Sequence, residues 1–240
     1  MDARGSALAG LRVLEVGGEI AAPYATKLLA DLGADVVKVE PPGGDALRRW
    51  SPFTDDPGDA GVLFGALNGG KRSALVDLAD PAGAAWLRAA LGGADLVVES
   101  LGAGGLEAIG VDTFASDARR VPLAVIRISD VGQEGPYVGR PTSPLVLQAL
   151  GAWVSSHGVP EMSPVQVGAR LHEYTAGSFA AAAALTAWRA ARLGDEPVVV
   201  DLSLIECLVG TLAYPNLVME DMLAAGLPPP MARHFPLPGI

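Results

Sequence analysis

The 240-residue sequence predicts an α/β fold, a doubly wound parallel sheet with helices on both faces, and three observations support this. Residues 11–49 read as strand, glycine turn, helix and strand in succession, which is the order of a βαβ unit. Apolar strand patterns and helix-period patterns then continue to alternate along the chain. The composition is 50% hydrophobic but only 5% aromatic, because Ala, Gly, Val and Leu dominate, as in tightly packed α/β proteins.

The first βαβ unit is the most informative segment. Arg12–Val16 has the pattern of a buried strand and is followed by a turn at Gly17-Gly18. A helix is predicted over Ala21–Leu32, with Gly33 at its C-cap, and a second strand over Asp35–Glu40. Parallel α/β sheets bind ligands at the carboxyl ends of their strands. The turn at Gly17-Gly18 and the segment 41–49 therefore mark a candidate site.

The remaining elements continue the alternation. Further strands are expected at Ser73–Asp77, Asp95–Glu99, Leu123–Ser129 and Pro197–Leu202, and further helices at Pro81–Leu91, Pro144–Val154, Tyr174–Leu193 and Leu204–Leu223. Asp130–Thr142 and His157–Gly168 are expected to be long loops. We interpret residues 1–225 as one Rossmann-like domain. Residues 226–240 are Pro-rich and apolar, and are expected to form an extended tail towards a second domain or a partner chain.

Composition and charge exclude several classes of function. The formal net charge of −10 argues against nucleic acid and anionic membranes as partners. No run of residues reaches the ~18 apolar positions of a membrane span, and the N-terminus lacks the pattern of a signal peptide, so a cytoplasmic location is expected. Cys207 is the single cysteine and is expected in the core, while His157 and His234 are expected in loops. No metal site is predicted.

Basic residues follow two glycine-rich turns. Arg48 and Arg49 come after the turn that ends the second strand, and Lys71 and Arg72 come after Asn68-Gly69-Gly70. Such turns let backbone N–H groups approach a phosphate while a neighbouring cation neutralises it. The alternative is that these pairs are solvated surface charge. The nucleotide-binding patterns G-x-G-x-x-G and G-x-x-x-x-G-K-[ST] do not occur in the sequence, which argues against nicotinamide and nucleoside triphosphate ligands.

Glu173 is the second candidate. It stands at the start of the Ala-rich helical run, directly after His172. A glutamate in the first turn of a helix is commonly there because it interacts favourably with the helix dipole. A reactive carboxylate is the other interpretation, and the residues alone leave both open.

The motifs taken together resemble those of the class III CoA-transferase family, the CaiB/BaiF group. The matching strings are LGADVVKVEPPGGD followed by Arg48, then NGGKRSALVDL, GQEGPY and VVVDLSLIECLV. The resemblance implies a CaiB/BaiF-type large domain and an enzyme that moves CoA from an acyl-CoA thioester to a free carboxylic acid. It also implies an interlocked homodimer, or a hetero-oligomer with a chain carrying the family's second half, because this chain matches about the first half of a typical member.

The resemblance also assigns roles to residues. It implies that CoA lies against the turn after the second strand and the segment after Asn68, with contacts from Val39, Arg48, Asn68, Lys71 and Arg72. Glu173 takes the position of the nucleophile, which is an aspartate in the family. The added methylene displaces the attacking oxygens, and such displacements can cost ~10²-fold in rate. Glu173 is therefore either a working variant or the mark of a subunit that has lost the reaction.

Two further departures leave alternatives open. Ser100–Gly104 lacks the arginine that the family usually has after its fourth strand, and Thr142–Pro144 replaces a pair that ends in aspartate. One alternative is a non-catalytic CoA-binding or scaffolding subunit. A 2-methylacyl-CoA racemase is the other, although it needs an acid and a base on opposite faces of one carbon. His172 and Glu173, adjacent at a helix start, are poorly suited to that arrangement.

Overall fold

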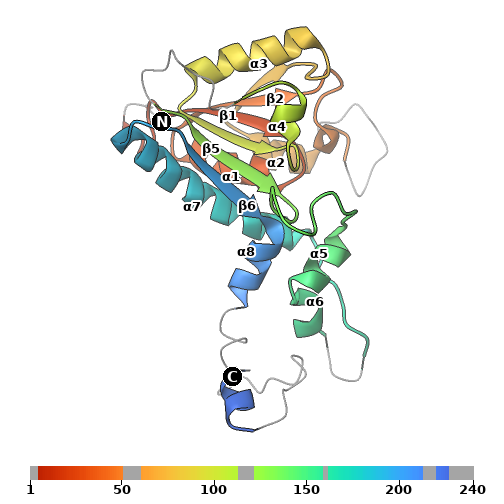
Figure 1. The fold of residues 1–240 in the computed structure, drawn as a ribbon. Coiled ribbons are helices and arrows are strands. Elements are labelled where there is room, and N and C mark those ends of the chain that lie inside the picture. The colour runs from red at the N-terminus through yellow and green to blue at the C-terminus, as the bar shows by residue number, and fades with distance from the viewer. Residues whose placement is uncertain (1–4, 51–60, 113–121, 159–161, 213–219, 227–240) are drawn as a thin grey trace.

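The computed structural model describes residues 5–50, 61–112, 122–158, 162–212 and 220–226. Six parallel strands form its central sheet, in the order β3-β2-β1-β4-β5-β6 (Figure 1). The predicted α/β fold class is thereby confirmed. The strands are β1 (Arg12–Gly17), β2 (Asp35–Glu40), β3 (Arg72–Leu75), β4 (Leu96–Ser100), β5 (Ala124–Ser129) and β6 (Val198–Ser203).

Helices connect these strands and cover both faces of the sheet. They are α1 (Ala21–Asp31), the 3₁₀ helix η2 (Ala46–Arg48), α2 (Val62–Asn68), α3 (Pro81–Gly93), α4 (Gly105–Ala108), α5 (Pro144–Leu150), α6 (Trp153–Ser156), α7 (Leu171–Leu193) and α8 (Leu204–Thr211). None of the helices in the described ranges is long and apolar enough to cross a membrane.

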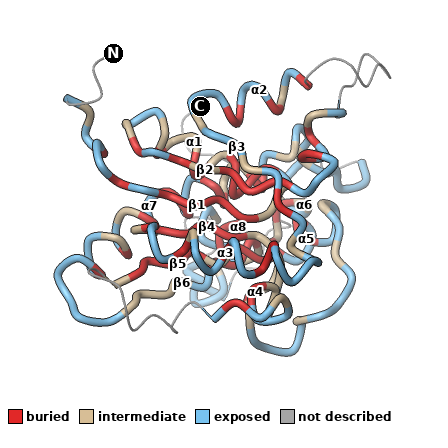
Figure 2. Tube along the Cα trace, turned by 90° about the horizontal axis from the view of Figure 1, so that it is seen from above, coloured by how far each residue is buried: buried red, intermediate tan, exposed pale blue. Residues whose placement is uncertain are grey.

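The strands alternate between two apolar clusters, one on each face of the sheet. Val13 and Val36 pack with α1 and α7, whereas Leu14 and Val16 point to the other face and pack with α3 and α4. Figure 1 shows α7 along one face and α3 along the other, and Figure 2, which looks onto the sheet from the side of α3, shows that the central strands are largely buried. Side chains of one strand point to opposite faces in turn, so each face has its own core.

The strand order reverses between β1 and β4, which run side by side although β2 and β3 lie between them in sequence. Their carboxyl ends meet at Gly17 and Ser100. Gly17 has a φ of 117°, and a Cβ there would lie 2.4 Å from Oγ of Ser100, so glycine is required. A reversal of this kind opens a crevice for ligands in doubly wound sheets.

Helices α1 and α7 pack closely because α7 presents small residues to α1. Ala176, Gly177, Ala180 and Ala184 are buried along one side of α7. A Cβ on Gly177 would lie 2.7 Å from the backbone oxygen of Ala21 and 3.0 Å from Cδ1 of Tyr24. The backbones of the two helices therefore approach to a distance that a larger residue would prevent.

We expect Gly177→Ala to destabilise the protein by about 1–3 kcal/mol, because the added methyl group overlaps a backbone oxygen that cannot rotate away. Gly210→Ala in α8 is the matched control, since the nearest atom to its added carbon is 4.0 Å away. Alanine has the higher helix propensity, so the control should gain up to about 1 kcal/mol. Urea denaturation of both variants checks this, and equal gains would contradict the close packing of α1 and α7.

Some element boundaries differ from those predicted. The single helix predicted over Pro144–Val154 is wrong: α5 ends at Leu150 and α6 begins at Trp153, because Ala152 takes a left-handed conformation with φ 64°. The helix predicted over Leu204–Leu223 is too long, since α8 ends at Thr211. The short elements η2, α2 and α4 were not predicted.

Of the other predictions, some are confirmed and some concern residues that the structure does not describe. Cys207 is buried in the core, and His157 follows the end of α6, as expected. His234, most of the predicted tail over 226–240 and residues 213–219 of the predicted last helix lie outside the described residues.

Candidate active site

A cleft of about 450 Å³ lies at the carboxyl ends of β1, β4 and β5. Residues at the ends of these strands or directly after them line it, including Gly18, Ser100 and Asp130. The first turn of α7 closes one side with His172 and Glu173. The cleft therefore sits at the point where the strand order reverses, as the fold predicts.

Glu173 is buried at the edge of this cleft, with 4% of its surface exposed. Its Oε2 accepts a hydrogen bond of 2.9 Å from the backbone N–H of Ile20, and its Oε1 accepts one from Nε of Arg170. Burial raises the pKa of Glu173 above its usual value, and the positive charge of Arg170 and the Ile20 N–H oppose that rise. The carboxylate is thus partly desolvated but held by two donors.

Arg170 also pairs with Glu19, which belongs to the loop between β1 and α1. Glu19 and Arg170 are both in the left-handed region, with φ of 62° and 54°, and so is Ala169 with φ 57°. Side-chain-bearing residues seldom adopt this conformation unless their surroundings require it. The β1–α1 loop and the start of α7 are thereby joined by one guanidinium.

His172 is buried beside Glu173 but is oriented by other groups. Its Nδ1 lies 3.4 Å from Nε2 of Gln148, and its Nε2 lies 3.7 Å from Oε1 of Glu173. Burial lowers the pKa of His172, and the charge of Arg170 lowers it further. A neutral imidazole at this place packs against Glu173 on the same side of the cleft.

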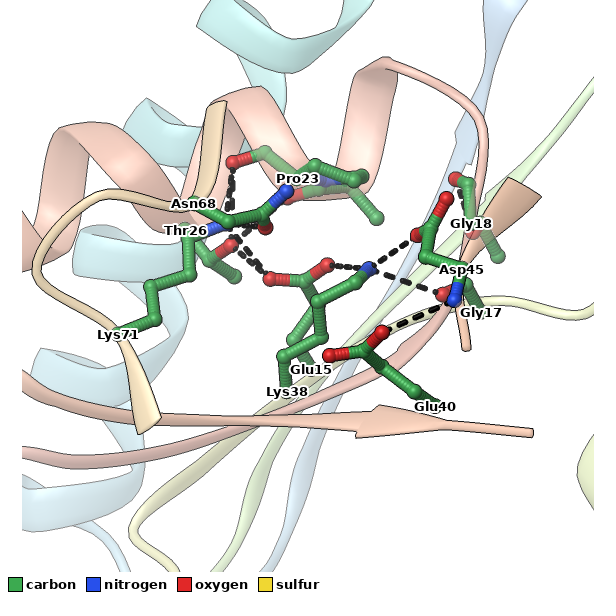
Figure 3. A network of polar contacts seen from close by, with 12 residues as sticks. Glu15, Gly17, Gly18, Pro23, Thr26, Lys38, Glu40, Asp45, Asn68 and Lys71 are labelled. Atoms are coloured by element: carbon green, nitrogen blue, oxygen red, sulfur yellow. Dashed lines mark hydrogen bonds and ion pairs between the residues drawn. The ribbon is translucent and has the colours of Figure 1, made fainter. Parts of the chain in front are cut away.

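The loop that supplies the Ile20 N–H rests on a buried network of charged groups (Figure 3). Nζ of Lys38 lies 2.6 Å from Oε1 of Glu15 and 2.8 Å from Oδ2 of Asp45, and donates to the backbone oxygen of Gly17 at 3.3 Å. Glu15 and Lys38 are opposite each other in the register of β1 and β2. The two cations beside Glu15 hold its pKa low despite burial, while Glu15 and Asp45 hold the pKa of Lys38 high.

Lys71 completes this network from the segment before β3. Its Nζ donates to Oε2 of Glu15 at 2.8 Å, to the backbone oxygen of Pro23 at 2.7 Å and to Oδ1 of Asn68 at 2.9 Å. Figure 3 shows the ammonium group directed inward, towards α1 and Glu15. Because an ammonium group has three N–H donors, the side chain of Lys71 is fully occupied in this state.

Arg48 forms a second, shallower pair on the segment after β2. Its guanidinium donates to both oxygens of Glu40, at 2.6 and 2.7 Å, and stacks 3.8 Å above the ring of Phe64. Burial alone would raise the pKa of Glu40, but the hydrogen bonds from Arg48, Ser73 and the backbone of Asp45 lower it to about 2. The side chain of Arg48 is 36% exposed, so one side of it faces solvent.

This pair should stabilise the protein in a pH-dependent way. Since the pKa of Glu40 falls from 4.5 to about 2 on folding, the unfolded chain takes up the proton first, and the stabilisation disappears as the pH falls through that interval. We expect roughly 2 kcal/mol to be lost, allowing for solvent around Arg48. The Glu40→Gln variant should have a lower free energy of unfolding than the wild type at neutral pH. Between pH about 6 and about 3 that free energy should depend less on pH than it does in the wild type, and denaturation across this range measures the difference. Glu134→Gln, at an exposed loop position, is the control and should follow the wild type.

The residues predicted to bind CoA fall into four places. Asn68 and Lys71 join the buried network, and Arg48 lies on the outer side of it. Arg72 lies at the amino end of β3, paired with the exposed Asp35 at 2.6 Å, and so is at the other edge of the sheet from Glu173. The side chain of Val39 packs into the core under α3. The structure therefore does not bring these five side chains together around the Glu173 cleft.

Sequence reasoning missed Glu15, Lys38, Asp45 and Arg170. A signal for the first two exists: one charged residue interrupts each of the apolar strands RVLEVG and DVVKVE, and opposed charges in neighbouring buried strands pair. Arg170 carries no comparable signal, because its contact with Glu19 joins positions 151 apart. Among the described residues there is no group of three or more His, Cys, Asp or Glu side chains placed to hold a metal.

Comparison with known proteins identifies the class of protein. Residues 8–234 match the family described as CoA-transferase family III, and the chain belongs to that family. It is 32% identical over 234 residues to a succinate–glutarate CoA-transferase of Agrobacterium fabrum, covering 95% of this chain and 58% of the relative. It is 33% identical over 201 residues to the β subunit of a succinyl-CoA–L-malate CoA-transferase of Chloroflexus aurantiacus, covering 83% and 49%.

A solved structure agrees with these relatives. The crystal structure of a CaiB/BaiF family protein from Brucella suis superimposes with a TM-score of 0.82 at 33% identity, covering 94% of this chain and 60% of that one. The chain thus spans about half to three-fifths of the length of the proteins it matches. The resemblance inferred from the sequence motifs is confirmed at the level of the family and the fold.

Proposed function

We propose that this chain carries the nucleophile of a CoA-transferase that moves CoA between an acyl-CoA thioester and a free carboxylic acid. The observation that supports this best is the position of Glu173, a buried carboxylate at the edge of the cleft that lies where the strand order reverses, which is where doubly wound sheets bind ligands. Two donors, Ile20 N–H and Arg170, fix the carboxylate before any substrate arrives. Such preorganisation is what an attacking group needs.

The chemistry is an exchange of one activated carboxyl for another. An oxygen of Glu173 attacks the thioester carbonyl, the C–S bond breaks, and a mixed anhydride and CoA thiolate form. The thiolate then attacks the glutamyl carbonyl, and the original acid leaves as its carboxylate, with glutamyl-CoA remaining on the protein. An acceptor carboxylate reverses these steps to give the new acyl-CoA. No water is consumed in these steps, so the thioester is not hydrolysed.

The residues of this chain supply binding and orientation for these steps. The Ile20 N–H holds Oε2 of Glu173, and Arg170 holds Oε1, so that both oxygens are fixed at the edge of the cleft. The Lys38 network fixes the loop from which that N–H comes. Val39, Arg48, Asn68, Lys71 and Arg72 remain proposed CoA contacts. Of these, the half-exposed Arg48 is the best placed to meet a phosphate through its open side.

A short dicarboxylic acid is our proposal for the substrate. Succinate or succinyl-CoA appears in the names of both relatives described above. The cleft also contains Arg140, an exposed arginine whose guanidinium lies 5.1 Å above the ring of Tyr137. Because the cleft is lined by Arg140 in addition to Arg170, it suits a substrate that has a second carboxylate.

We also propose that the active protein contains more than one chain. One relative is named as a β subunit, and several large apolar residues are exposed here on α5, α7 and α8, namely Leu145, Val146, Leu150, Phe179 and Val209. An interlocked homodimer or a hetero-oligomer would cover such residues.

The racemase alternative is disfavoured by geometry. His172 and Glu173 are 3.7 Å apart on one turn of α7, so they approach a substrate from the same side. Removal and return of a proton on opposite faces requires groups on both sides of the carbon. Loss of deuterium from an α-deuterated 2-methylacyl-CoA would revive this alternative.

The proposed function is tested by trapping the intermediate. The purified chain, alone and with any partner polypeptide, is incubated with a panel of acyl-CoAs that begins with succinyl-CoA, then treated with borohydride or hydroxylamine and analysed by mass spectrometry. Modification at Glu173 is expected. CoA binding without modification would overturn the proposal and favour a non-catalytic CoA-binding subunit.

A further inference from the structure

Arg170 is the cation in direct contact with Glu173, and it is held from both sides. Its Nε donates to Glu173, and its Nη2 donates to Glu19 on the β1–α1 loop. It lines the cleft, and 38% of its side chain is exposed. The guanidinium therefore faces both the carboxylate and the space that a substrate would enter.

The backbone at both ends of this bridge is unusual. Arg170, the preceding Ala169 and Glu19 all have positive φ values, between 54° and 62°. Left-handed side-chain-bearing residues persist where the surrounding structure fixes them, and they gather at sites of function. From this backbone conformation the guanidinium of Arg170 reaches the carboxylate of Glu173 in the first turn of α7.

The proposed reaction changes what Arg170 faces. In the free protein it lies between two carboxylates, Glu19 and Glu173. When Glu173 becomes glutamyl-CoA, its negative charge is lost, and the acid released from the donor appears as a carboxylate at the same place. One carboxylate is consumed and one is formed within reach of the same guanidinium, while Glu19 continues to hold its other side.

We propose, on the basis of the function proposed above, that Arg170 binds the reacting carboxylate of the acid substrate once Glu173 has been converted to its thioester. The leaving acid and the incoming acid would occupy in turn the position that Glu173 vacates. A guanidinium has the planar pair of donors that recognises a carboxylate through two parallel hydrogen bonds. Glu19 is the positioning residue that keeps Arg170 in place.

The test separates binding of the acid from formation of the thioester. Arg170→Gln and Arg170→Lys are assayed with the acyl-CoA that labels Glu173 fastest in the wild type. Two quantities are measured: the amount of trapped glutamyl-CoA, and the KM for the matching free acid in isotope exchange between labelled acid and acyl-CoA. Arg192→Gln, at the far end of α7, is the control for loss of one positive charge.

We expect Arg170→Gln to form glutamyl-CoA more slowly than the wild type, because Glu173 loses one of its two donors, but still to form it. The KM for the acid should rise by about 10- to 100-fold, the range for a lost charge-assisted hydrogen bond. Arg170→Lys should recover part of that loss, because it restores the charge without the paired donors. If Arg170 only supported the structure, its replacement would instead lower the amount of trapped glutamyl-CoA and the rate of isotope exchange together. The KM for the acid would then be unchanged.

The outcomes also separate this inference from the proposed function. The role of Arg170 alone would be overturned if the wild-type protein is labelled at Glu173 but the KM for the acid is the same in the Arg170 variants as in the wild type. Wild-type protein that is never labelled at Glu173 would overturn the proposed function and this inference with it.

Discussion

Replacing Glu173 with glutamine is expected to lower CoA transfer by more than about 10³-fold, because the amide has no anionic oxygen with which to attack a thioester. Glutamine has nearly the same shape and can still accept the hydrogen bond from Ile20 N–H, so the fold should be kept. Isotope exchange between acid and acyl-CoA measures the rate. Calorimetric titration with CoA should show that binding is retained.

Glu173→Asp is the matched variant for this experiment. It keeps the carboxylate but withdraws it by one methylene from the position that Ile20 and Arg170 define. A displacement of this order costs ~10²-fold in rate. Aspartate should therefore remain measurably active and be labelled by acyl-CoA, whereas glutamine should not. Equal rates for Glu173→Gln and wild type would refute the role of this residue.

Replacing Lys38 with methionine should produce the largest loss of stability, about 3–5 kcal/mol. Methionine keeps the length of the side chain but leaves Oε1 of Glu15 and Oδ2 of Asp45 buried without the cation that they share, while Oε2 of Glu15 stays paired with Lys71. The exposed fractions decide the size of this effect: the side chain of Lys38 is 1% exposed and that of Glu15 is fully buried. An unpaired buried charge is far more costly than the net value of the pair.

Arg72→Met is the control for the Lys38 experiment. It breaks an ion pair of similar length on the neighbouring strand, but the side chains of Arg72 and Asp35 are 66% and 50% exposed. Such a pair contributes up to about 1 kcal/mol. Thermal and urea denaturation of both variants measure the difference, and equal losses would contradict the account of the buried network.

Periodicity in the sequence was sufficient to predict the sheet and its main helices. Strands buried on both faces have continuous apolar runs, and α1, α3 and α7 have helix-length patterns bounded by glycine or proline. The break between α5 and α6 was missed because Ala152 has no sequence signal for a left-handed conformation. The short helix α2 was missed because seven residues carry too little periodicity.

The candidate site was harder to predict because it depends on contacts between distant segments. Glu173 was found through the resemblance to a family, and the structure adds its donors. Lys71 has a glycine-rich turn before it, which suggests a phosphate contact, yet its ammonium group is directed towards Glu15 and α1. A local pattern indicates which groups are available, whereas tertiary packing decides which of them faces a ligand.

The hydrogen bond from Ile20 N–H to Glu173 joins residues 153 positions apart, and this has a consequence during synthesis. Strand β1 and helix α1 leave the ribosome early, but α7 must emerge before it can pack on α1. Until then Glu173 is an ordinary solvated carboxylate, with neither its backbone donor nor its buried surroundings. The nascent chain should therefore be inert towards the thioesters around it, and reactivity should appear together with the docking of α7 on α1.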